Sequence, residues 1–283
     1  MANIESGETL LGFKNDAIYD VLSQYPGGLC LDVGAAAGVS TASILASSPN
    51  SRVIAFEPFP GNFGFFEQKH EMDTRVKLIR KAVSNHAHRQ KFYVSRTVQN
   101  GAGSWRGMDG YSSVGQLVED DHPQADKAIE VETCRLDDVV KEPVRLLKVD
   151  VQGAEYDLLD GARTLFDQHG VDIAYIEFSG DERITEFFAE RGYRMFDTEY
   201  QIVLGRIAKE EHHWKVLRQG AVSTGAKVGF GWPVDCPRDI KSYAAFIEQQ
   251  RRSLGHVQTD LVCVAPSIAA SFEAACYRTA NSG

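Results

Sequence analysis

Short apolar runs alternate with stretches in which apolar residues recur at helical spacing, so strands and helices are predicted to alternate along the chain. The runs that predict strands are Leu29–Asp32, Arg52–Phe56, Val76–Ile79, Lys91–Val94, Ile129–Thr133, Leu146–Val149 and Asp172–Phe178. Helices are predicted at Asn15–Gln24, from Ser40 through Leu45, at Phe63–Glu71 and from Glu155 onward. This alternation favours an α/β fold, in which a mostly parallel sheet carries helices on both faces.

The first apolar run ends in a turn that contains Gly34 and Gly38. Glycine has no side chain, so a ligand can lie against the backbone there, and the following helix presents free N–H groups. The dinucleotide fingerprint requires further glycines where this chain has Ala36 and Val39. The turn therefore favours a cofactor without a pyrophosphate, such as S-adenosylmethionine, over NAD.

Three acids are expected at one edge of the sheet, because the carboxyl ends of parallel strands lie together. Asp32 ends the first run, Glu57 follows the second strand 19 residues after Gly38, and Asp150 follows Leu146–Val149. An acid in the place of Glu57 can accept hydrogen bonds from both ribose hydroxyls of a nucleoside. The alternative for Glu57 is a solvated loop residue.

Taken in order, the motifs of this chain resemble those of the FkbM family of S-adenosylmethionine-dependent methyltransferases. They are Leu-Asp-Val-Gly-Ala-Ala-Ala-Gly, Ala-Phe-Glu-Pro-Phe-Pro, Lys-Ala-Val-Ser, Tyr-Ser-Ser-Val, Leu-Asp-Asp, Leu-Lys-Val-Asp-Val-Gln-Gly-Ala-Glu and Gly192-Tyr193, between Leu29 and Leu204. The resemblance implies a class I methyltransferase (Rossmann-like) fold, with a seven-stranded, mostly parallel sheet that ends in a reversed hairpin. It also implies O-methylation of a hydroxyl on a sugar, a glycosylated compound or a polyketide-type small molecule of natural product biosynthesis.

The resemblance also assigns expected roles by position. Gly34 and Gly38 would border the methionine part of the cofactor, Glu57 the ribose, and Asp150 the rim near the sulfonium. The expected cofactor-binding residues are Asp32, Gly34, Gly38, Glu57, Phe59, Ala82, Val83 and Asp150. Ala82 and Val83 would lie near adenine, whereas Phe59 could lie against that ring or belong to the core.

The chain departs from the family at two of these motifs. The family often has Asn where this chain has Ala36, so one polar contact near the cofactor would be missing. It often has Glu where this chain has Gln152, which removes a charge, although glutamine also occurs there. We therefore interpret Gln152 as a variant that retains activity.

Methyl transfer to an alcohol needs a general base or a divalent metal that lowers the pKa of the hydroxyl. Asp150 is the first candidate for either role, followed by Glu177 and Glu155. Asp150 could instead orient the cofactor amine or a water. The pair Asp137-Asp138 is interpreted as a helix cap or a metal pair.

Four segments are expected along the chain. They are an N-terminal helical segment (1–28), a cofactor-binding core (29–204), an insertion near the active site (205–255) and a last strand with its tail (256–283). The last strand is expected at Gln258–Val264, running against its neighbours. The insertion is expected to shape either the substrate pocket or a subunit interface, and the glycine-rich loop Thr97–Ser113 to close over a substrate or to be a surface insertion.

Composition narrows the classes of protein. The net charge of −9 argues against a nucleic-acid partner, because such affinity depends on basic side chains. The sequence lacks an apolar segment of membrane-spanning length and begins without signal-peptide features, so a cytoplasmic protein with no membrane partner is expected. Five scattered cysteines predict free thiols.

The sequence thus predicts an enzyme that binds S-adenosylmethionine and a hydroxylated small molecule. It leaves a metal ion and a homo-oligomer open. The alternatives are an NAD-dependent oxidoreductase and a catalytically inactive cofactor-binding module that serves a partner.

Overall fold

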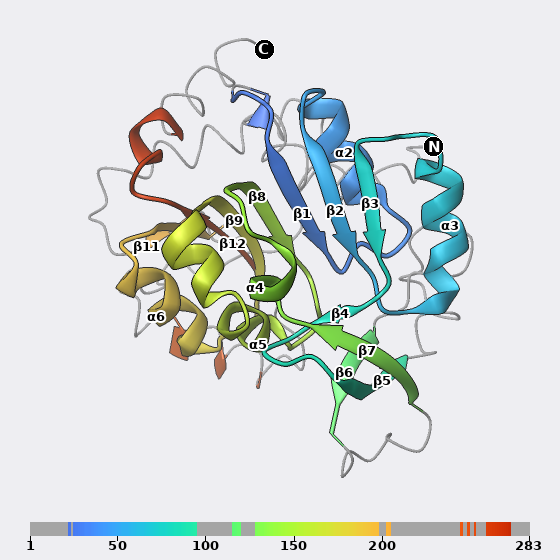
Figure 1. The fold of residues 1–283 in the computed structure, drawn as a ribbon. Helices are drawn as coiled ribbons and strands as arrows, with labels where there is room; N and C mark the ends of the chain where they lie inside the picture. The colour runs from blue at the N-terminus through green and yellow to red at the C-terminus, as the bar shows by residue number, and fades with distance from the viewer. Residues whose placement is uncertain are drawn as a thin grey trace, which may run out of the picture. The chain divides into compact units, whose positions relative to one another are not determined.

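A computed structural model of the chain describes residues 22–23, 25–94, 115–119, 128–197, 202–204, 244–245, 248–249, 252 and 259–272 (Figure 1). The chain divides into two compact units. One comprises residues 27–171, and the other comprises residues 1–26 and 172–283.

A parallel sheet forms the centre of the unit 27–171. Its strands are β1 (Leu29–Val33), β2 (Arg52–Phe56), β3 (Val76–Ile79) and β8 (Val144–Val149), in the order β3-β2-β1-β8. All five residues of β1 are buried, as expected for a strand flanked on both sides by parallel neighbours. The apolar runs therefore predicted the four strands and their direction correctly.

Helices precede or follow these strands along the chain. They are α2 (Val39–Ser47), α3 (Pro60–His70), α4 (Leu136–Val139), α5 (Glu155–Asp160) and the π-helix η3 (Leu165–His169). Helix α2 packs on β1 and β2. Helix α3 begins three residues before the predicted Phe63, because Pro60 at its first turn has a backbone angle that suits a helix start.

A second, smaller sheet in the same unit was not predicted. It contains β4 (Ala82–Val83), β7 (Ile129–Cys134), β5 (Arg89–Val94) and β6 (Gly115–Val118), in the order β4-β7-β5-β6. Strand β5 pairs antiparallel with both β6 and β7. Buried Ala82, Phe92 and Val131 form a core cluster on this sheet, against which Phe59 packs.

The other unit contains the predicted reversed strand. Its elements are β9 (Val171–Phe178), α6 (Glu182–Glu190), β10 (Arg194–Asp197), β11 (Ile202–Leu204) and β12 (Thr259–Val264). Strand β12 pairs antiparallel with β9 and with β10, which in turn pairs antiparallel with β11. These strands and the parallel strands of the first unit confirm the α/β class I methyltransferase fold.

Several predictions concern residues outside the described ranges. These are the Thr97–Ser113 loop, most of the N-terminal helical segment and most of the 205–255 insertion. Among the residues that are described, no helix is long and apolar enough to cross a membrane. Cys30, Cys134 and Cys263 are free, buried thiols, as predicted for them.

Candidate functional site

The carboxyl ends of β1, β2 and β8 lie side by side at one edge of the parallel sheet. Val33, the last residue of β1, is in register with the last residues of both neighbouring strands. Gly34, Glu57 and Asp150 therefore follow three adjacent strand ends, which is the arrangement predicted from the sequence. Ligands of open parallel sheets bind at this edge.

The loops after β1 and β8 are in direct backbone contact. The N–H of Asp150 donates to the carbonyl of Val33 at 3.0 Å. Gly34 has a φ of +79°, and a Cβ at this position would lie 1.9 Å from the carbonyl oxygen of Asp150. Only glycine therefore fits here, because both the left-handed backbone and the neighbouring chain exclude a side chain.

Glu57 links the loop after β1 to the start of α3. One carboxylate oxygen accepts the N–H of Ala36 at 2.8 Å, and the other accepts the N–H of Phe59 at 2.8 Å and Nδ2 of Asn62 at 3.2 Å. The residue is 4% exposed, and this burial raises its pKa above the ordinary value, although the three hydrogen bonds oppose the shift. Glu57 is therefore an acceptor fixed in place by two elements rather than a solvated loop residue.

Gly38 permits close packing of α3 against the loop. Its φ is +79°, and a Cβ would lie 2.6 Å from Nε2 of His70 and 2.9 Å from the ring of Phe66. That histidine nitrogen is 2.8 Å from the carbonyl oxygen of Gly38. The space on the Cβ side of Gly38 is thus filled by protein, so the lack of a side chain serves the packing of α3 as well as the access to the backbone that the sequence predicts.

Asp32 lies within β1 and is fully buried. Its Oδ2 accepts a hydrogen bond from the hydroxyl of Thr41 on α2 at 2.7 Å. Its Oδ1 lies 3.5 Å from Nζ of Lys148, the residue beside it on β8. The Asp32 carboxylate therefore contacts α2 through Thr41 and β8 through Lys148.

Asp150 presents the most exposed carboxylate of the strand ends. Its side chain is 46% exposed, with Oδ2 3.7 Å from Nζ of Lys148. Its Oδ1 accepts a hydrogen bond from Nε2 of Gln152 at 2.8 Å. Gln152 has a φ of +57°, an uncommon conformation for a residue other than glycine, asparagine or aspartate. A cation and an amide donor thus hold a carboxylate that faces solvent.

Lys148 is a residue of this site that the sequence motifs do not predict. Its side chain is 8% exposed, and its ammonium donates to the carbonyl of Gly34 at 3.2 Å while lying near Asp32 and Asp150. One feature of the sequence could have indicated it, because Lys148 is the one charged residue in the apolar run Leu146–Val149. A lysine in a buried strand is rare unless it is paired with an acid.

Glu155 closes the loop after β8. Both of its carboxylate oxygens accept the N–H of Gly153 at 3.0 Å, and Oε1 lies 3.4 Å from the N–H of Val151. The residue is 4% exposed, and burial, with a smaller contribution from the charge of Asp150, raises its pKa. Its oxygens are therefore directed to the loop backbone.

The remaining predicted residues lie in two places. Phe59 is half-buried against Ala82, and Val83 is buried with its neighbour in β4. Glu177 lies on β9 in the other unit, in register with Asp260 of β12. Phe59 and Ala82 thus share the apolar cluster of the small sheet.

Asp137 lies within α4, whose N-cap is Arg135, and its side chain binds the start of another helix. Its carboxylate accepts the N–H groups of Thr164 and Leu165 at 3.0 and 2.7 Å, at the start of η3. Within the described ranges, no group of three or more histidine, cysteine or acidic side chains is placed to hold a metal ion.

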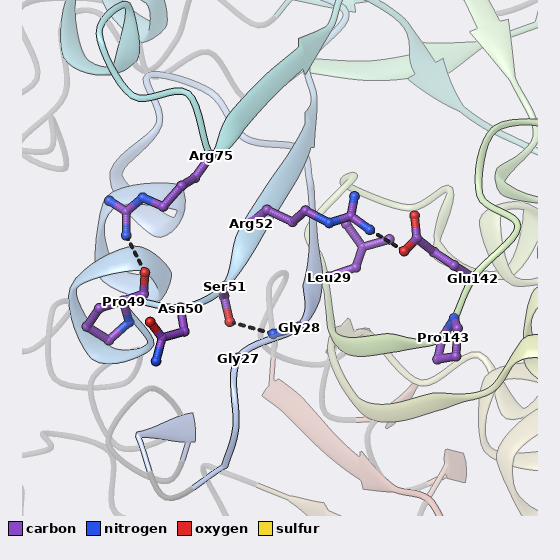
Figure 2. Close-up of a pocket in the computed structure, with 10 residues that line it drawn as sticks. All are labelled: Gly27, Gly28, Leu29, Pro49, Asn50, Ser51, Arg52, Arg75, Glu142 and Pro143. Carbon is purple, nitrogen blue, oxygen red and sulfur yellow. Dashed lines mark hydrogen bonds and ion pairs between the residues drawn. The ribbon is translucent and has the colours of Figure 1, made fainter.

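A cavity of about 400 Å³ lies at the opposite edge of the sheet, by the amino ends of β1 and β2 (Figure 2). Arg52 pairs with Glu142 on its rim, and Arg75 donates to the carbonyl of Pro49 at 2.8 Å. The cavity is separate from the strand ends that carry Gly34 and Asp150.

Three loops that meet at the carboxyl ends of a parallel sheet are the arrangement of an α/β protein with the class I methyltransferase fold. The methyltransferase FkbM domain family model matches residues 32–195, more than half of the chain. The chain therefore belongs to the FkbM methyltransferase domain family.

Two curated relatives are similar to part of the chain. The chain is 30% identical to 2-O-methyltransferase NoeI of Sinorhizobium fredii over 169 residues, which are 57% of this chain and 67% of the relative. It is 27% identical to Methyltransferase 1 of Beauveria bassiana over 164 residues, which are 54% of this chain and 65% of the relative. The matched region thus covers about two thirds of each relative.

Among solved structures, the chain is similar to methyltransferase FkbM from Methylobacillus flagellatus KT. The identity is 17% and the TM-score 0.43, and the match covers 61% of this chain but 40% of that chain. The chain therefore spans less than half the length of that protein.

Proposed function

We propose that the protein is an S-adenosylmethionine-dependent O-methyltransferase that acts on a hydroxyl of a sugar, a glycosylated compound or a polyketide-type small molecule. The observation that carries the proposal is the family match over residues 32–195, which spans the three strand-end loops. The choice of a hydroxyl acceptor is supported by the 30% identity to a protein named 2-O-methyltransferase.

The chemistry of the strand-end residues fits this cofactor. Glu57 is a fixed acceptor suited to ribose hydroxyls, and the half-buried ring of Phe59, which packs against the cluster of Ala82, suits an adenine ring. Asp150 offers an exposed carboxylate suited to a cationic amine or sulfonium. We propose Gly34 and Gly38 as the backbone wall beside the methionine part, supported by the buried Asp32, which binds Thr41 of the following helix. Val83, next to Ala82, is proposed to lie near the adenine.

The bound cofactor would supply an electrophilic methyl group. The chain must then hold an acceptor hydroxyl in line with that group and accept its proton. We propose Asp150 as the residue that contacts the reacting groups, because it is exposed where Glu155 is buried against its own loop. Glu177 remains a proposed second base on β9.

The test is transfer of a labelled methyl group from S-adenosylmethionine to a panel of hydroxylated acceptors, including oligosaccharides and glycosylated polyketides. We expect a methyl ether product, and loss of most turnover in Asp150→Asn. Tight binding of S-adenosylmethionine without transfer to any acceptor would favour the inactive binding module. Binding of NAD but not of S-adenosylmethionine would overturn the proposal.

A further inference from the structure

Lys148 is the cation on which the loops after β1 and β8 converge. Its ammonium lies 3.5 Å from Asp32, 3.7 Å from Asp150 and 3.2 Å from the carbonyl of Gly34. These three groups belong to the strand ends at which the proposed cofactor would bind. Lys148 therefore contacts both the buried carboxylate of Asp32 and the exposed carboxylate of Asp150.

The charges of this cluster do not cancel. Asp32 and Asp150 contribute two carboxylates and Lys148 one ammonium, so these three side chains carry a net charge of −1 when all are ionised. Asp32 is fully buried and the lysine is 8% exposed, so water screens their interaction weakly. A change of one charge here alters the potential at the site more than it would on the surface.

We propose that Lys148 is a positioning residue, which orients the carboxylate of Asp150 and sets the net charge of the part of the cofactor site beside Asp150. This net charge determines how strongly the site prefers a cationic ligand over a neutral one. The proposal rests on the proposed function. S-adenosylmethionine carries a sulfonium cation, whereas its product S-adenosylhomocysteine is a neutral thioether of nearly the same shape. The ratio of the two affinities therefore reports the charge of the site and discounts effects common to both ligands.

A charge series tests the proposal by calorimetric titration of each ligand. Lys148→Gln removes the cation but keeps a donor for the carbonyl of Gly34, and is expected to shift the affinity ratio toward S-adenosylmethionine by about threefold to tenfold. Asp32→Asn removes an anion and is expected to shift the ratio toward S-adenosylhomocysteine. The double variant restores the net charge, and its ratio is expected to return close to that of the wild type.

Lys81→Met is the matched control. Lys81 forms an ion pair with Glu132 at 2.9 Å on the surface of the same unit, with 41% of its side chain exposed. Its loss is expected to leave both affinities unchanged, because exposed pairs are screened by solvent. Lys148→Met offers a second neutral variant if the glutamine variant does not fold.

The outcomes separate the two proposals. An unchanged affinity ratio in a folded Lys148 variant would overturn the role of the lysine, whatever happens to the melting temperature. Failure of the wild-type protein to bind either ligand would instead overturn the proposed function. A shifted ratio in the single variants that returns in the double variant would support the inference, since a purely structural role would not follow the sign of the charge.

Discussion

Glu57 and Glu155 are buried carboxylates whose oxygens accept hydrogen bonds from the chain itself. Glu57 accepts a hydrogen bond from the loop after β1, and Glu155 accepts hydrogen bonds from the loop after β8. The sequence predicts ligand chemistry for both, because an acid in a loop or at a helix start gives no sign of its partners. At the residue scale, the structure gives Glu57 a further role, since it holds the loop that would hold the ligand.

Glu57→Ala tests this double role. We expect a loss of about 2 to 3 kcal/mol in the free energy of unfolding, because Ala36, Phe59 and Asn62 lose a buried charged acceptor. Chemical denaturation measures the loss, and titration with S-adenosylmethionine is expected to show severely weakened binding. Binding of near-normal affinity would remove Glu57 from the proposed ribose contact, and unchanged stability would contradict its structural role.

Ala36 is held in a left-handed conformation with a φ of +46°, which is unfavourable for alanine. Ala36→Gly removes the steric cost, so we expect the free energy of unfolding to rise by up to about 1 kcal/mol. Thermal unfolding measures the change. The same substitution at Ala46, on the exposed face of α2, is the control and should destabilise by about 0.5 to 1 kcal/mol. Destabilisation in both variants would contradict the assignment of strain to Ala36.

Burial gives Glu155 a pH-dependent contribution to stability. Because its folded pKa lies above the ordinary 4.5, the folded protein binds this proton more tightly than the unfolded chain does. The stability due to protonation is therefore complete below pH 4.5 and is lost as the pH rises through the folded pKa.

Urea unfolding of the wild type and of Glu155→Gln, from pH 4 to pH 8, measures this contribution. We expect the difference in unfolding free energy, wild type minus variant, to fall as the pH rises. A difference that rises with pH would mean that the carboxylate is stabilised by the loop N–H groups more than it is destabilised by burial.

At the scale of elements, the strands were the easiest part to predict, since β1, β2, β3 and β8 are apolar runs bounded by turn residues. The small sheet was not predicted, because β4 has two residues and β6 four, and such short pairings depend on tertiary contacts. Lys148 was missed for a related reason, since periodicity places a residue in a strand but does not identify its partners.

The close contact between the loops after β1 and β8 requires glycine at position 34. Gly34→Ala would place a methyl group 1.9 Å from a backbone oxygen, so we expect a loss of about 3 kcal/mol or more, measured by chemical denaturation. Gly64→Ala is the control, because that glycine lies within α3 with open space around its Cβ position. It should stabilise by about 0.5 to 1 kcal/mol. Equal effects of the two substitutions would contradict the close approach of the β1 and β8 loops.

At the scale of the whole molecule, the class of fold and the family could be predicted from the order of the motifs. Position along the chain, together with the rule that parallel strands end at one edge, brings Gly34, Glu57 and Asp150 together. The acceptor could not be predicted in the same way, because side chains of loops set acceptor specificity and no periodicity governs them.

The central claim is that the loops after β1, β2 and β8 form one site for S-adenosylmethionine. A crystal structure of the protein with S-adenosylhomocysteine tests it most directly. We expect the ribose within hydrogen-bonding distance of Glu57 and the homocysteine part beside Gly34 and Asp150. A nucleoside bound elsewhere, for example in the cavity lined by Arg52 and Arg75, would contradict it.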